Sequence, residues 1–380
     1  MPKKPAIVFY RHTNLFNYPE TFIRTQGEGL QHFTPYYVGL GRVEQLPPPV
    51  ERTIVVNQGG VVGKAQEMFY RVWGIAPRLY RQVRKLDPVL IHAHFGTDGA
   101  KALPLAQSLQ VPLLVTFWGY DATAKDEYLQ RSYGHRLYLR RREVLKREAR
   151  LFIAVSGFIK EKLVKQGFPP EKIVVHYNAV DTETFRPDPA VAREPVVLYV
   201  GRLVEKKGVE YLIRAMAQVQ VEMPDTELVI IGDGPLRPKL EESAMKLLKR
   251  YRFLGVQPPG VVRGWMNRAL LLGTPSVTAS TGDSEGMPTV VLEAQAMGLP
   301  VVSTVHSGIS EAVSHGETGF LVAERDWEML ARCIARLLED ETLWQRFSRK
   351  GQERMHSIFS VHNQTRELEN IYDRVLRGDI

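Results

Sequence analysis

Short apolar runs alternate with helical patterns along the chain. The runs are rich in β-branched residues, and the segments between them carry apolar residues at helical spacing. This alternation is typical of βαβ units and parallel sheets, and it argues against an all-β sandwich. The predicted strands of the first half are Ala6–Tyr10, Tyr36–Gly39, Thr53–Asn57, Val89–His94, Leu113–Phe117, Leu151–Val155 and Ile173–His176. Those of the second half are Val196–Val200, Glu227–Ile231, Arg252–Leu254, Leu271–Thr274, Val301–Thr304 and Gly319–Val322.

The number of residues and the grouping of the strands predict two domains. A chain of 380 residues is too long for one ordinary α/β core, so we expect an α/β protein with two doubly wound, Rossmann-like domains. Prolines interrupt the polar segment 185–195, which is therefore the predicted linker. The predicted domains are residues 1–188 and 189–361. The amphipathic segment 362–380 needs an apolar surface, and we expect it to form a helix that packs on the first domain.

Composition indicates a reducing compartment. Cys333 is the single cysteine, so a disulfide framework is excluded. The sequence begins without the long apolar segment of a signal peptide, and no apolar run approaches the length that spans a bilayer. We therefore expect a cytoplasmic protein.

The net charge of +8 arises in the first half. Residues 1–190 hold 27 Lys and Arg against 17 Asp and Glu, a net +10, whereas the remainder hold 23 against 25, a net −2. Basic residues concentrate in the segment 131–150. A solvated helix face and peripheral contact with an anionic membrane explain this pattern equally well. No nucleic-acid-binding motif accompanies the charge, so nucleic acid is not an expected partner.

Two glycine-containing motifs follow predicted strands of the second half. In the first, Gly201 to Gly208, Arg202 and Lys207 lie at the carboxyl edge of a parallel sheet, where ligands bind. A basic loop facing solvent explains that motif equally well when it is taken alone. The second, Gly232-Asp233-Gly234-Pro235, has glycines that permit close approach of a ligand.

The strongest motif is the segment Ser284 to Ala294. Pro288 suits the first turn of the helix that follows, and the free N–H groups at that helix start form a ready anion site. Glu293 lies about two turns downstream among apolar residues, where an unpartnered carboxylate is costly to bury. We therefore expect Glu293 to accept hydrogen bonds from a ligand, such as those of ribose hydroxyls, rather than to be an ordinary exposed glutamate.

Together these motifs resemble the retaining glycosyltransferases of family 4, and the match covers about half the chain. The family has the GT-B fold, in which two Rossmann-like domains face a cleft and a C-terminal helix crosses back to the first domain. The resemblance implies an acceptor-side first domain and a second domain that binds a nucleotide-sugar donor. The matching residues are Gly201-Arg202, Lys207-Gly208, Gly232 to Pro235, Phe253-Leu254-Gly255, Glu285, Glu293, Ala296 to Val302, Gly308, Glu311 and Gly316 to Gly319.

The resemblance also implies a role for each matched residue. Arg202 and Lys207 would hold the donor diphosphate, Glu293 the ribose, and Glu285 the transferring sugar. The further donor contacts that it implies are the backbone N–H groups of Gly286 and Met287, the adjoining Pro288, the turn glycines Gly232 and Gly234, and the base-binding run Leu254-Gly255-Val256.

We expect neither a metal nor a cofactor. The sequence contains no Asp-x-Asp motif, so Arg202, Lys207 and a helix N-terminus would stabilise the charge on the leaving diphosphate. In the family's retaining mechanism the acceptor attacks from the face that the diphosphate leaves, and no protein nucleophile is required.

The first half resembles a narrower branch, the exopolysaccharide transferases of the colanic-acid and amylovoran type. The resemblance rests on Tyr18 to Ile23, which includes Glu20 and Thr21, and on His92 to Gly96. His92 and His94 point to the same side of a strand, and His94, nearer the carboxyl end, is the candidate for the site. The related proteins read Phe-His-Gly where this chain reads Phe117-Trp118-Gly119. We expect Trp118, with Glu20, Thr21 and Asp121, to shape the sugar or acceptor pocket.

Two functions remain open from the sequence. The first is transfer of a sugar from a nucleotide sugar, with a UDP-sugar favoured, to a glycan or lipid-linked oligosaccharide in surface polysaccharide assembly. The second is a catalytically weak nucleotide-sugar-binding subunit that partners an active transferase, because Trp118 replaces a sugar-contacting histidine. The candidate catalytic residues are His94, Glu285, Arg202 and Lys207.

Overall fold

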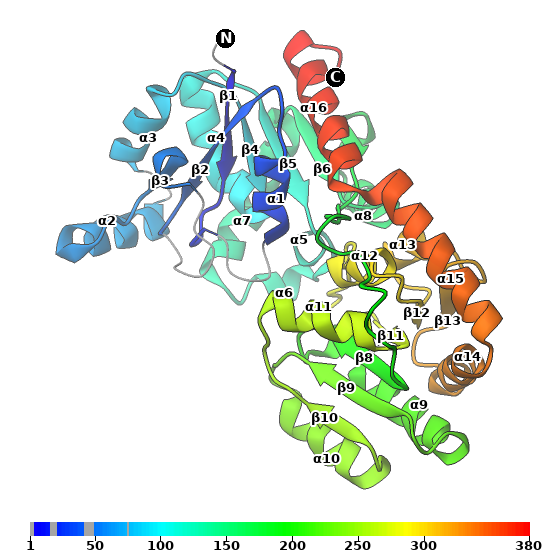
Figure 1. The fold of residues 1–380 in the computed structure, drawn as a ribbon. Coiled ribbons are helices and arrows are strands. Elements are labelled where there is room, and N and C mark those ends of the chain that lie inside the picture. The colour runs from blue at the N-terminus through cyan, green and yellow to red at the C-terminus, as the bar shows by residue number, and fades with distance from the viewer. Residues whose placement is uncertain (1–3, 16–20, 42–48, 74–75) are drawn as a thin grey trace. The chain divides into compact units, whose positions relative to one another are not determined.

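The computed structural model describes residues 4–15, 21–41, 49–73 and 76–380. The chain divides into two compact units (Figure 1). Unit 1 comprises the chain up to Tyr177 together with Val361–Ile380, and unit 2 comprises Asn178–Ser360. Each unit is built around its own parallel sheet, so the predicted fold class is confirmed.

The sheet of unit 1 has seven strands in the order β3-β2-β1-β4-β5-β6-β7, and its described pairs are parallel. The strand order reverses between β1 and β4, which makes their carboxyl ends the topological switch point of this unit. The strands are β1 Ala6–Tyr10, β2 Thr34–Gly39, β3 Thr53–Val55, β4 Pro88–His94, β5 Leu113–Phe117, β6 Leu151–Ala154 and β7 Ile173–Val175. The helices are α1 Thr21–Glu28, α2 Gly60–Trp73, α3 Pro77–Arg84, α4 Gly96–Leu109, α5 Tyr120–Thr123, α6 Asp126–Leu129, α7 Tyr133–Glu148, α8 Gly157–Lys165 and α16 Val361–Arg377.

The sheet of unit 2 has six strands in the order β10-β9-β8-β11-β12-β13, again with parallel pairs. Its strand order reverses between β8 and β11. The strands are β8 Val196–Val200, β9 Glu227–Ile231, β10 Tyr251–Phe253, β11 Leu271–Thr274, β12 Val301–Thr304 and β13 Gly319–Val322. The helices are α9 Val209–Glu222, α10 Arg237–Leu247, α11 Pro259–Arg268, α12 Thr289–Ala296, α13 Ile309–Ala312, α14 Trp327–Glu339 and α15 Glu341–Arg354.

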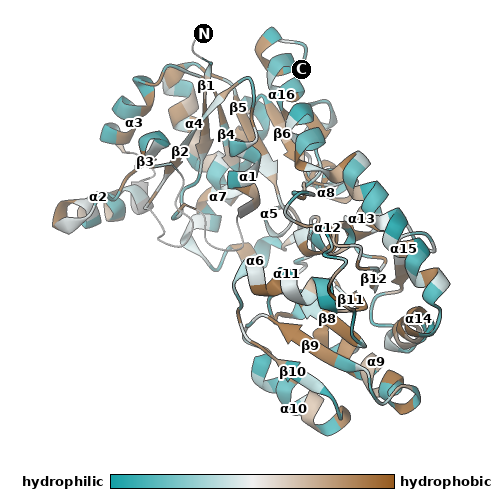
Figure 2. Ribbon diagram, in the orientation of Figure 1, coloured by the Kyte–Doolittle hydropathy of each residue, from teal (hydrophilic) through white to brown (hydrophobic). Residues whose placement is uncertain are grey.

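The strands form the apolar centre of each unit because helices cover both faces of a parallel sheet. Figure 2 shows this distribution: brown concentrates on the strands, whereas the helices carry both colours. Strand β1 is buried along its whole length. Every predicted strand is present, with ends that differ only slightly from the predicted ones. None of the helices in the described part of the chain is long and apolar enough to cross a membrane.

The C-terminal helix α16 completes the core of unit 1. Its residues Leu368, Ile371, Tyr372 and Val375 are buried in the same apolar cluster as β1. The Tyr372 hydroxyl lies 2.7 Å from Nδ1 of His92 on β4. The apolar surface that the amphipathic sequence of α16 requires is therefore the core of unit 1.

The boundary between the units differs from the predicted one at residue 188. The chain passes from unit 1 to unit 2 after Tyr177, and the proline-rich segment lies within unit 2. This segment lacks regular secondary structure but is held by side chains, because the Asp188 N–H donates to the Asn267 side-chain oxygen (3.0 Å) and Glu194 pairs with Arg268 (2.8 Å). The prolines correctly predicted a segment without regular structure, but this segment packs on unit 2 and therefore belongs to that unit.

Candidate active site

The loops that follow β8 and β11 meet at the switch point of unit 2. Arg202 and Lys207 lie in the loop after β8, which ends in a short 3-10 turn, Glu205–Lys207, before α9. Gly208 closes this turn with a φ of +61°, and a Cβ there would clash with the carbonyl oxygen of Pro275 after β11. Glycine therefore lets the loop that carries Lys207 pack directly on the neighbouring loop.

Two lysine–carboxylate ion pairs lie side by side in this region. Lys207 Nζ is 2.8 Å from Glu285 Oε1, and both side chains are nearly buried, at 13% and 8% exposure. Lys206 Nζ is 3.0 Å from Asp283 Oδ1. Burial acts against the charge on Glu285, but the Lys207 and Lys206 ammonium groups overcome it and lower the pKa of this carboxyl to about 2. Glu285 is therefore ionised at neutral pH and can accept hydrogen bonds but cannot donate a proton.

The structure thus brings Lys207 and Glu285 together, as their implied roles require. Arg202, the third charged residue of the expected set, is exposed on the same loop, and no ion pair involves it among the described residues. Lys206 was not predicted, although it precedes Lys207 in a sequence that already indicated a basic loop. The carboxylate that orients it, Asp283, is 77 residues away in the sequence, so only the fold reveals the pair.

The backbone of Glu285 is fixed by a buried histidine that the sequence did not single out. The Glu285 N–H donates to Nε2 of His306 (3.2 Å), and Nδ1 of His306 lies 2.7 Å from Oε1 of Glu324. Because Nε2 accepts, the ring proton is on Nδ1 and is donated to Glu324. Thr278 donates to Glu324 through both its backbone N–H and its hydroxyl. This chain of hydrogen bonds holds the backbone at Glu285.

Helix α12 begins beside the ion pairs. Pro288 is its N-cap residue, and no protein acceptor is described for the N–H groups of Gly286 and Met287 just before it. These N–H groups and the helix dipole make the site suitable for an anion. The Asn178 amide anchors this turn through its bond to the Met287 carbonyl.

Glu293 lies on α12 and is half-buried. No side-chain hydrogen bond or ion pair involves it among the described residues, and burial raises its pKa to about 7. A carboxylate in this setting lacks the donors that would normally accompany its burial. The environment of Glu293 is compatible with the expected role of this carboxylate, which is to accept hydrogen bonds from hydroxyl groups of a ligand.

The glycines of the turn Gly232 to Pro235 lie against the backbone of a neighbouring loop. A Cβ on Gly232 would clash with the Gly201 carbonyl, and one on Gly234 would lie 2.5 Å from the Leu203 carbonyl. Leu203 also donates its N–H to the carbonyl of Asp233 (2.9 Å). The glycines therefore permit close approach of two protein loops, and they support the loop that carries Arg202.

The expected base-binding run follows β10 at the same edge. The Gly255 carbonyl accepts from the N–H of Gly232 (2.8 Å), which joins the run to the turn after β9. Gly255 has a φ of +67°, and the Val256 side chain is 69% exposed. The run is thus tied to the supporting turn and presents an apolar side chain to solvent.

In unit 1 the two strand histidines have different environments. His92 is satisfied, because Nδ1 contacts the Tyr372 hydroxyl and Nε2 lies 2.6 Å from the Thr116 hydroxyl. Burial lowers its pKa to about 3. His94 is equally buried, but neither ring nitrogen has a hydrogen-bond partner among the described residues. Burial, and then the charges of His92 and Arg11, lower the pKa of His94 well below its ordinary value. His92 is thus structural, and His94 is a neutral imidazole whose polar atoms are unused.

Trp118 encloses His94. The rings of His94 and Trp118 stack with their centroids 5.9 Å apart. The ring of Phe22 on α1 packs against Trp118 as well, with 4.2 Å between the two ring centroids. The indole Nε1 is buried without a hydrogen-bond partner in the described part of the chain. A direct contact between His94 and a sugar therefore requires a shift of the rings that surround it.

Asp121 is held by backbone N–H groups. Its carboxylate accepts from Gly96 (2.9 Å), Trp118 (3.0 Å) and Gly119 (3.1 Å), which ties the turn after β5 to the start of α4. Burial raises its pKa to about 6 although these bonds oppose the shift. Asp121 thus positions Trp118. Thr21 is the first residue of α1, and Glu20 lies outside the described residues.

A second charged group at the switch point of unit 1 was not predicted. Arg11, directly after β1, donates to the Asp98 carboxylate (2.7 Å) and to the His94 carbonyl (3.0 Å). His12 contacts the other Asp98 oxygen through Nδ1. Burial acts against the charge on Asp98, but Arg11 and His12 lower its pKa below the ordinary value. The position of Arg11 and His12 just after a predicted strand was the available signal.

Comparisons with known proteins identify the family of this chain. A family model described as Glycosyl transferases group 1 matches residues 181–354, and one described as Glycosyltransferase Family 4 matches residues 34–184. A colanic acid biosynthesis glycosyltransferase of Salmonella typhimurium is 31% identical over 295 residues, which cover 74% of this chain and 70% of that protein. An amylovoran biosynthesis glycosyltransferase of Erwinia amylovora is 30% identical over 288 residues, covering 74% and 69%.

Solved structures share the fold. HepE of Anabaena, in complex with UDP and glucose, aligns with a TM-score of 0.76 at 22% identity, covering 97% of this chain and 99% of that one. Sucrose-phosphate synthase of Thermosynechococcus elongatus aligns with a TM-score of 0.78 at 21% identity, covering 99% and 100%. The two Rossmann-like units are those of the GT-B enzymes. The chain belongs to family 4 of the glycosyltransferases, and it is a hexosyltransferase that resembles the colanic-acid and amylovoran type, as predicted.

The His306 network generates a prediction. His306→Ala removes the acceptor for the buried Glu285 N–H, so we expect a loss of about 1–3 kcal/mol in the free energy of unfolding, together with slower sugar transfer. His306→Gln offers an amide oxygen near the position of Nε2 and should retain more of both. Chemical denaturation and initial rates measure the two effects, with His356→Ala, an exposed histidine of unit 2, as control. Equal rates for wild type and His306→Ala would show that this network does not position Glu285.

Proposed function

We propose that this protein is a retaining, metal-independent glycosyltransferase that moves a sugar from a nucleotide sugar, with a UDP-sugar favoured, to a glycan or lipid-linked acceptor in exopolysaccharide biosynthesis. The observation that carries the proposal is the carboxyl edge of unit 2, where two lysines, the start of α12 and two buried or half-buried glutamates converge. The names of the relatives support the process, and the UDP and glucose bound by HepE support the donor class.

The donor diphosphate would bind where positive charge gathers. Lys207 and exposed Arg202 lie on one loop, and the N–H groups before α12 add a positive dipole. When the bond between the sugar and the phosphate breaks, negative charge grows on the leaving diphosphate. Cations already in place stabilise that charge, which is the role that a metal has in many other transferases.

Glu285 would contact the transferring sugar. Its ionised carboxylate can accept hydrogen bonds from sugar hydroxyls, and Lys207 at 2.8 Å offsets its charge. In a retaining reaction without a protein nucleophile, the acceptor oxygen attacks C1 from the face that the diphosphate leaves. The acceptor's proton passes to the departing phosphate oxygen, so Glu285 need not carry a proton.

The basic segment of unit 1 limits the proposed membrane contact. Arg142 forms a bidentate pair with Asp126, and Lys146 contacts Glu143. Arg150 donates to the carbonyl of Ile380. Part of the charge of this segment is therefore engaged within unit 1, which favours a cytoplasmic protein whose membrane contact is electrostatic and peripheral. No comparison supports the alternative of a binding subunit that lacks turnover of its own.

If Arg202 stabilises the donor diphosphate in place of a metal, donor turnover should respond to Arg202→Ala and not to a chelator. Arg202→Ala removes a charge without breaking a described ion pair, and a charge-assisted bond contributes about 1.5–3 kcal/mol, so we expect donor turnover to fall at least about tenfold with unchanged stability. Lys239→Ala, an exposed lysine on α10, is the matched control. A chelator should leave the rate unchanged. Activity that disappears with chelator and returns with magnesium would contradict the proposal.

The pKa of Glu293 predicts a pH dependence of donor binding. The donor-free carboxyl has a pKa of about 7, above its ordinary value, whereas hydrogen bonds from ribose hydroxyls favour the ionised form. Affinity for an intact nucleotide sugar should therefore be full above pH 7 and fall as the pH drops through 7, by roughly tenfold at one unit below. Calorimetric titration tests this, because the diphosphate of an intact nucleotide sugar does not titrate in this range. Glu293→Gln should abolish the dependence, and a variant that retains it would exclude Glu293 as the cause.

A further inference from the structure

Two buried serine hydroxyls of unit 2 have no hydrogen-bond partner in the described part of the chain. They belong to Ser276 and Ser307. Ser276 follows β11 and Ser307 follows β12, and these two strands are neighbours in the sheet. Both hydroxyls therefore lie at the carboxyl edge of the sheet, where the candidate donor site is. A polar group that is cut off from water and from protein partners needs an explanation.

Ser307 differs from Ser276 in its exposure and in its backbone. Ser276 is fully buried, whereas Ser307 is only partly buried. The φ of Ser307 is +47°, a left-handed conformation that costs free energy in a non-glycine residue but not in glycine. Such strain is typical of functional sites. A glycine here would remove the strain and the hydroxyl together, so the hydroxyl is what the strained residue adds to the loop.

The two neighbours of Ser307 hold it against the backbone of the candidate donor site. The Glu285 N–H donates to Nε2 of His306 (3.2 Å), and the Gly308 N–H donates to the carbonyl of Gly286 (3.0 Å). Ser307 lies in the chain between the residues that make these two contacts. Its backbone therefore runs beside Glu285 and Gly286, the part of the site that we expect to meet the transferring sugar.

The hydroxyl of Ser307 can reach a ligand through a small movement. Its Oγ is covered although the residue as a whole is partly exposed. Rotation about the Cα–Cβ bond moves Oγ among three staggered positions, and this rotation can bring it to the exposed side. A hydroxyl both donates and accepts hydrogen bonds, so it suits a sugar hydroxyl, which does the same.

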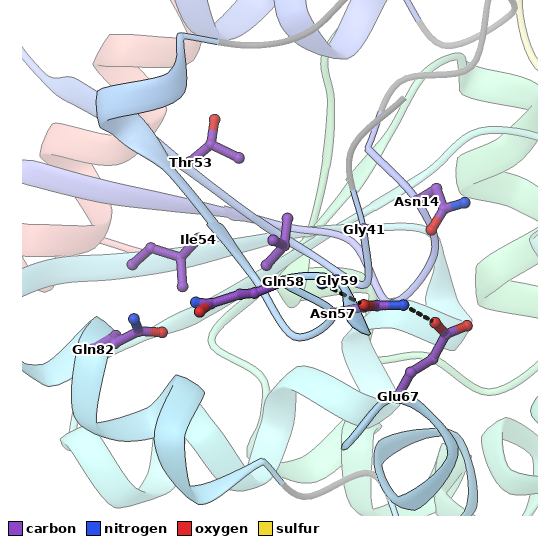
Figure 3. Close-up of a pocket in the computed structure, with 10 residues that line it drawn as sticks. Asn14, Gly41, Thr53, Ile54, Asn57, Gln58, Gly59, Glu67 and Gln82 are labelled. Carbon is purple, nitrogen blue, oxygen red and sulfur yellow. Dashed lines mark hydrogen bonds between the residues drawn. The ribbon is translucent and has the colours of Figure 1, made fainter. Parts of the chain in front are cut away.

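Polar side chains in a cavity of unit 1 show the contrasting case. This cavity has a volume of about 640 Å³, and Asn57 and Glu67 line it. Figure 3 shows Asn57 between the Gly59 N–H, which donates to its Oδ1 (2.9 Å), and the Glu67 carboxylate, which accepts from its Nδ2 (2.5 Å). The amide of Asn57 thus has partners without a ligand, whereas the Ser307 hydroxyl has none.

We propose that the hydroxyl of Ser307 contacts the transferring sugar of the donor and contributes to the choice of that sugar. It would form a hydrogen bond with one sugar hydroxyl, while the Glu285 carboxylate accepts from another. The ionised carboxylate can only accept, whereas the serine can also donate, so the two groups make different demands on the sugar. This inference rests on the proposed function and adds a specificity-determining residue to it.

Two substitutions at Ser307 separate the hydroxyl from the backbone strain. Ser307→Gly removes both, and Ser307→Ala removes the hydroxyl alone. Each should weaken binding of a UDP-hexose by about three- to tenfold. The midpoint of denaturant unfolding for Ser307→Gly should stay at or above the wild-type value, because the strain is relieved. Gln110→Gly is the matched control, since Gln110 is exposed, has a φ of +56° and ends α4 in unit 1. It should leave donor binding unchanged.

Calorimetric titration supplies the readout. UDP-glucose, UDP-galactose and their N-acetylamino forms would be compared first, and the UDP-hexose that the wild type binds most tightly would be used further. Both Ser307 variants should bind UDP alone as the wild type does. Monodeoxy analogues of the chosen sugar identify the contact, because the loss caused by Ser307→Gly should vanish for the analogue that lacks the partner hydroxyl.

Three outcomes would overturn the inference. The variants could lose affinity for UDP and for the UDP-hexose by the same factor, which would place the contact on the nucleotide. The loss could be equal for every monodeoxy analogue, or both variants could bind the UDP-hexose as the wild type does. Failure of the proposed function looks different, because the wild type itself would then bind neither UDP nor any UDP-hexose.

Discussion

The candidate donor site depends on a charged pair that is almost removed from water. Lys207 and Glu285 lie 2.8 Å apart and are nearly buried, and the lysine keeps the glutamate ionised. Burying such a pair weakens stability relative to apolar packing, so its persistence suggests a purpose other than folding. A donor that brings a diphosphate to the lysine and hydroxyls to the glutamate would satisfy both groups at once. The pair would then be a preorganised site, in which both charged side chains are already in position before the donor binds.

The surrounding backbone is arranged to keep that pair in place. Gly208 lets the lysine loop pack on the loop after β11, and Gly232 and Gly234 let the turn after β9 support it from the other side. His306 holds the N–H of Glu285. Lysine and glutamate side chains are long and flexible. A backbone that is fixed on both sides lowers the entropic cost of ordering these side chains when a ligand binds.

Local sequence patterns predicted those features that neighbouring residues determine. The strands were predictable because burial on both faces imposes a continuous apolar run. Lys207 and Glu285 were predictable because each lies in a motif at a strand or helix end. Position along the strand singled out His94 for the site, but the partner that satisfies His92 could not be predicted, since Tyr372 lies 280 positions away. The same limit applies to Arg11 with Asp98, and to the glycines of the turn after β9, whose close neighbours are the backbones of Gly201 and Leu203.

A double-mutant cycle on Lys207 and Glu285 tests most directly whether the pair exists for the substrate. Lys207→Met and Glu285→Gln each leave one buried charge without its partner, so each alone should lower the free energy of unfolding by roughly 3–5 kcal/mol. The double variant leaves neither charge and should recover most of that stability, which denaturant unfolding would show as strong coupling. The rate of sugar transfer by the double variant should be as low as that of the less active of the two single variants. Recovery of transfer together with stability would contradict the account, because the pair would then be structural.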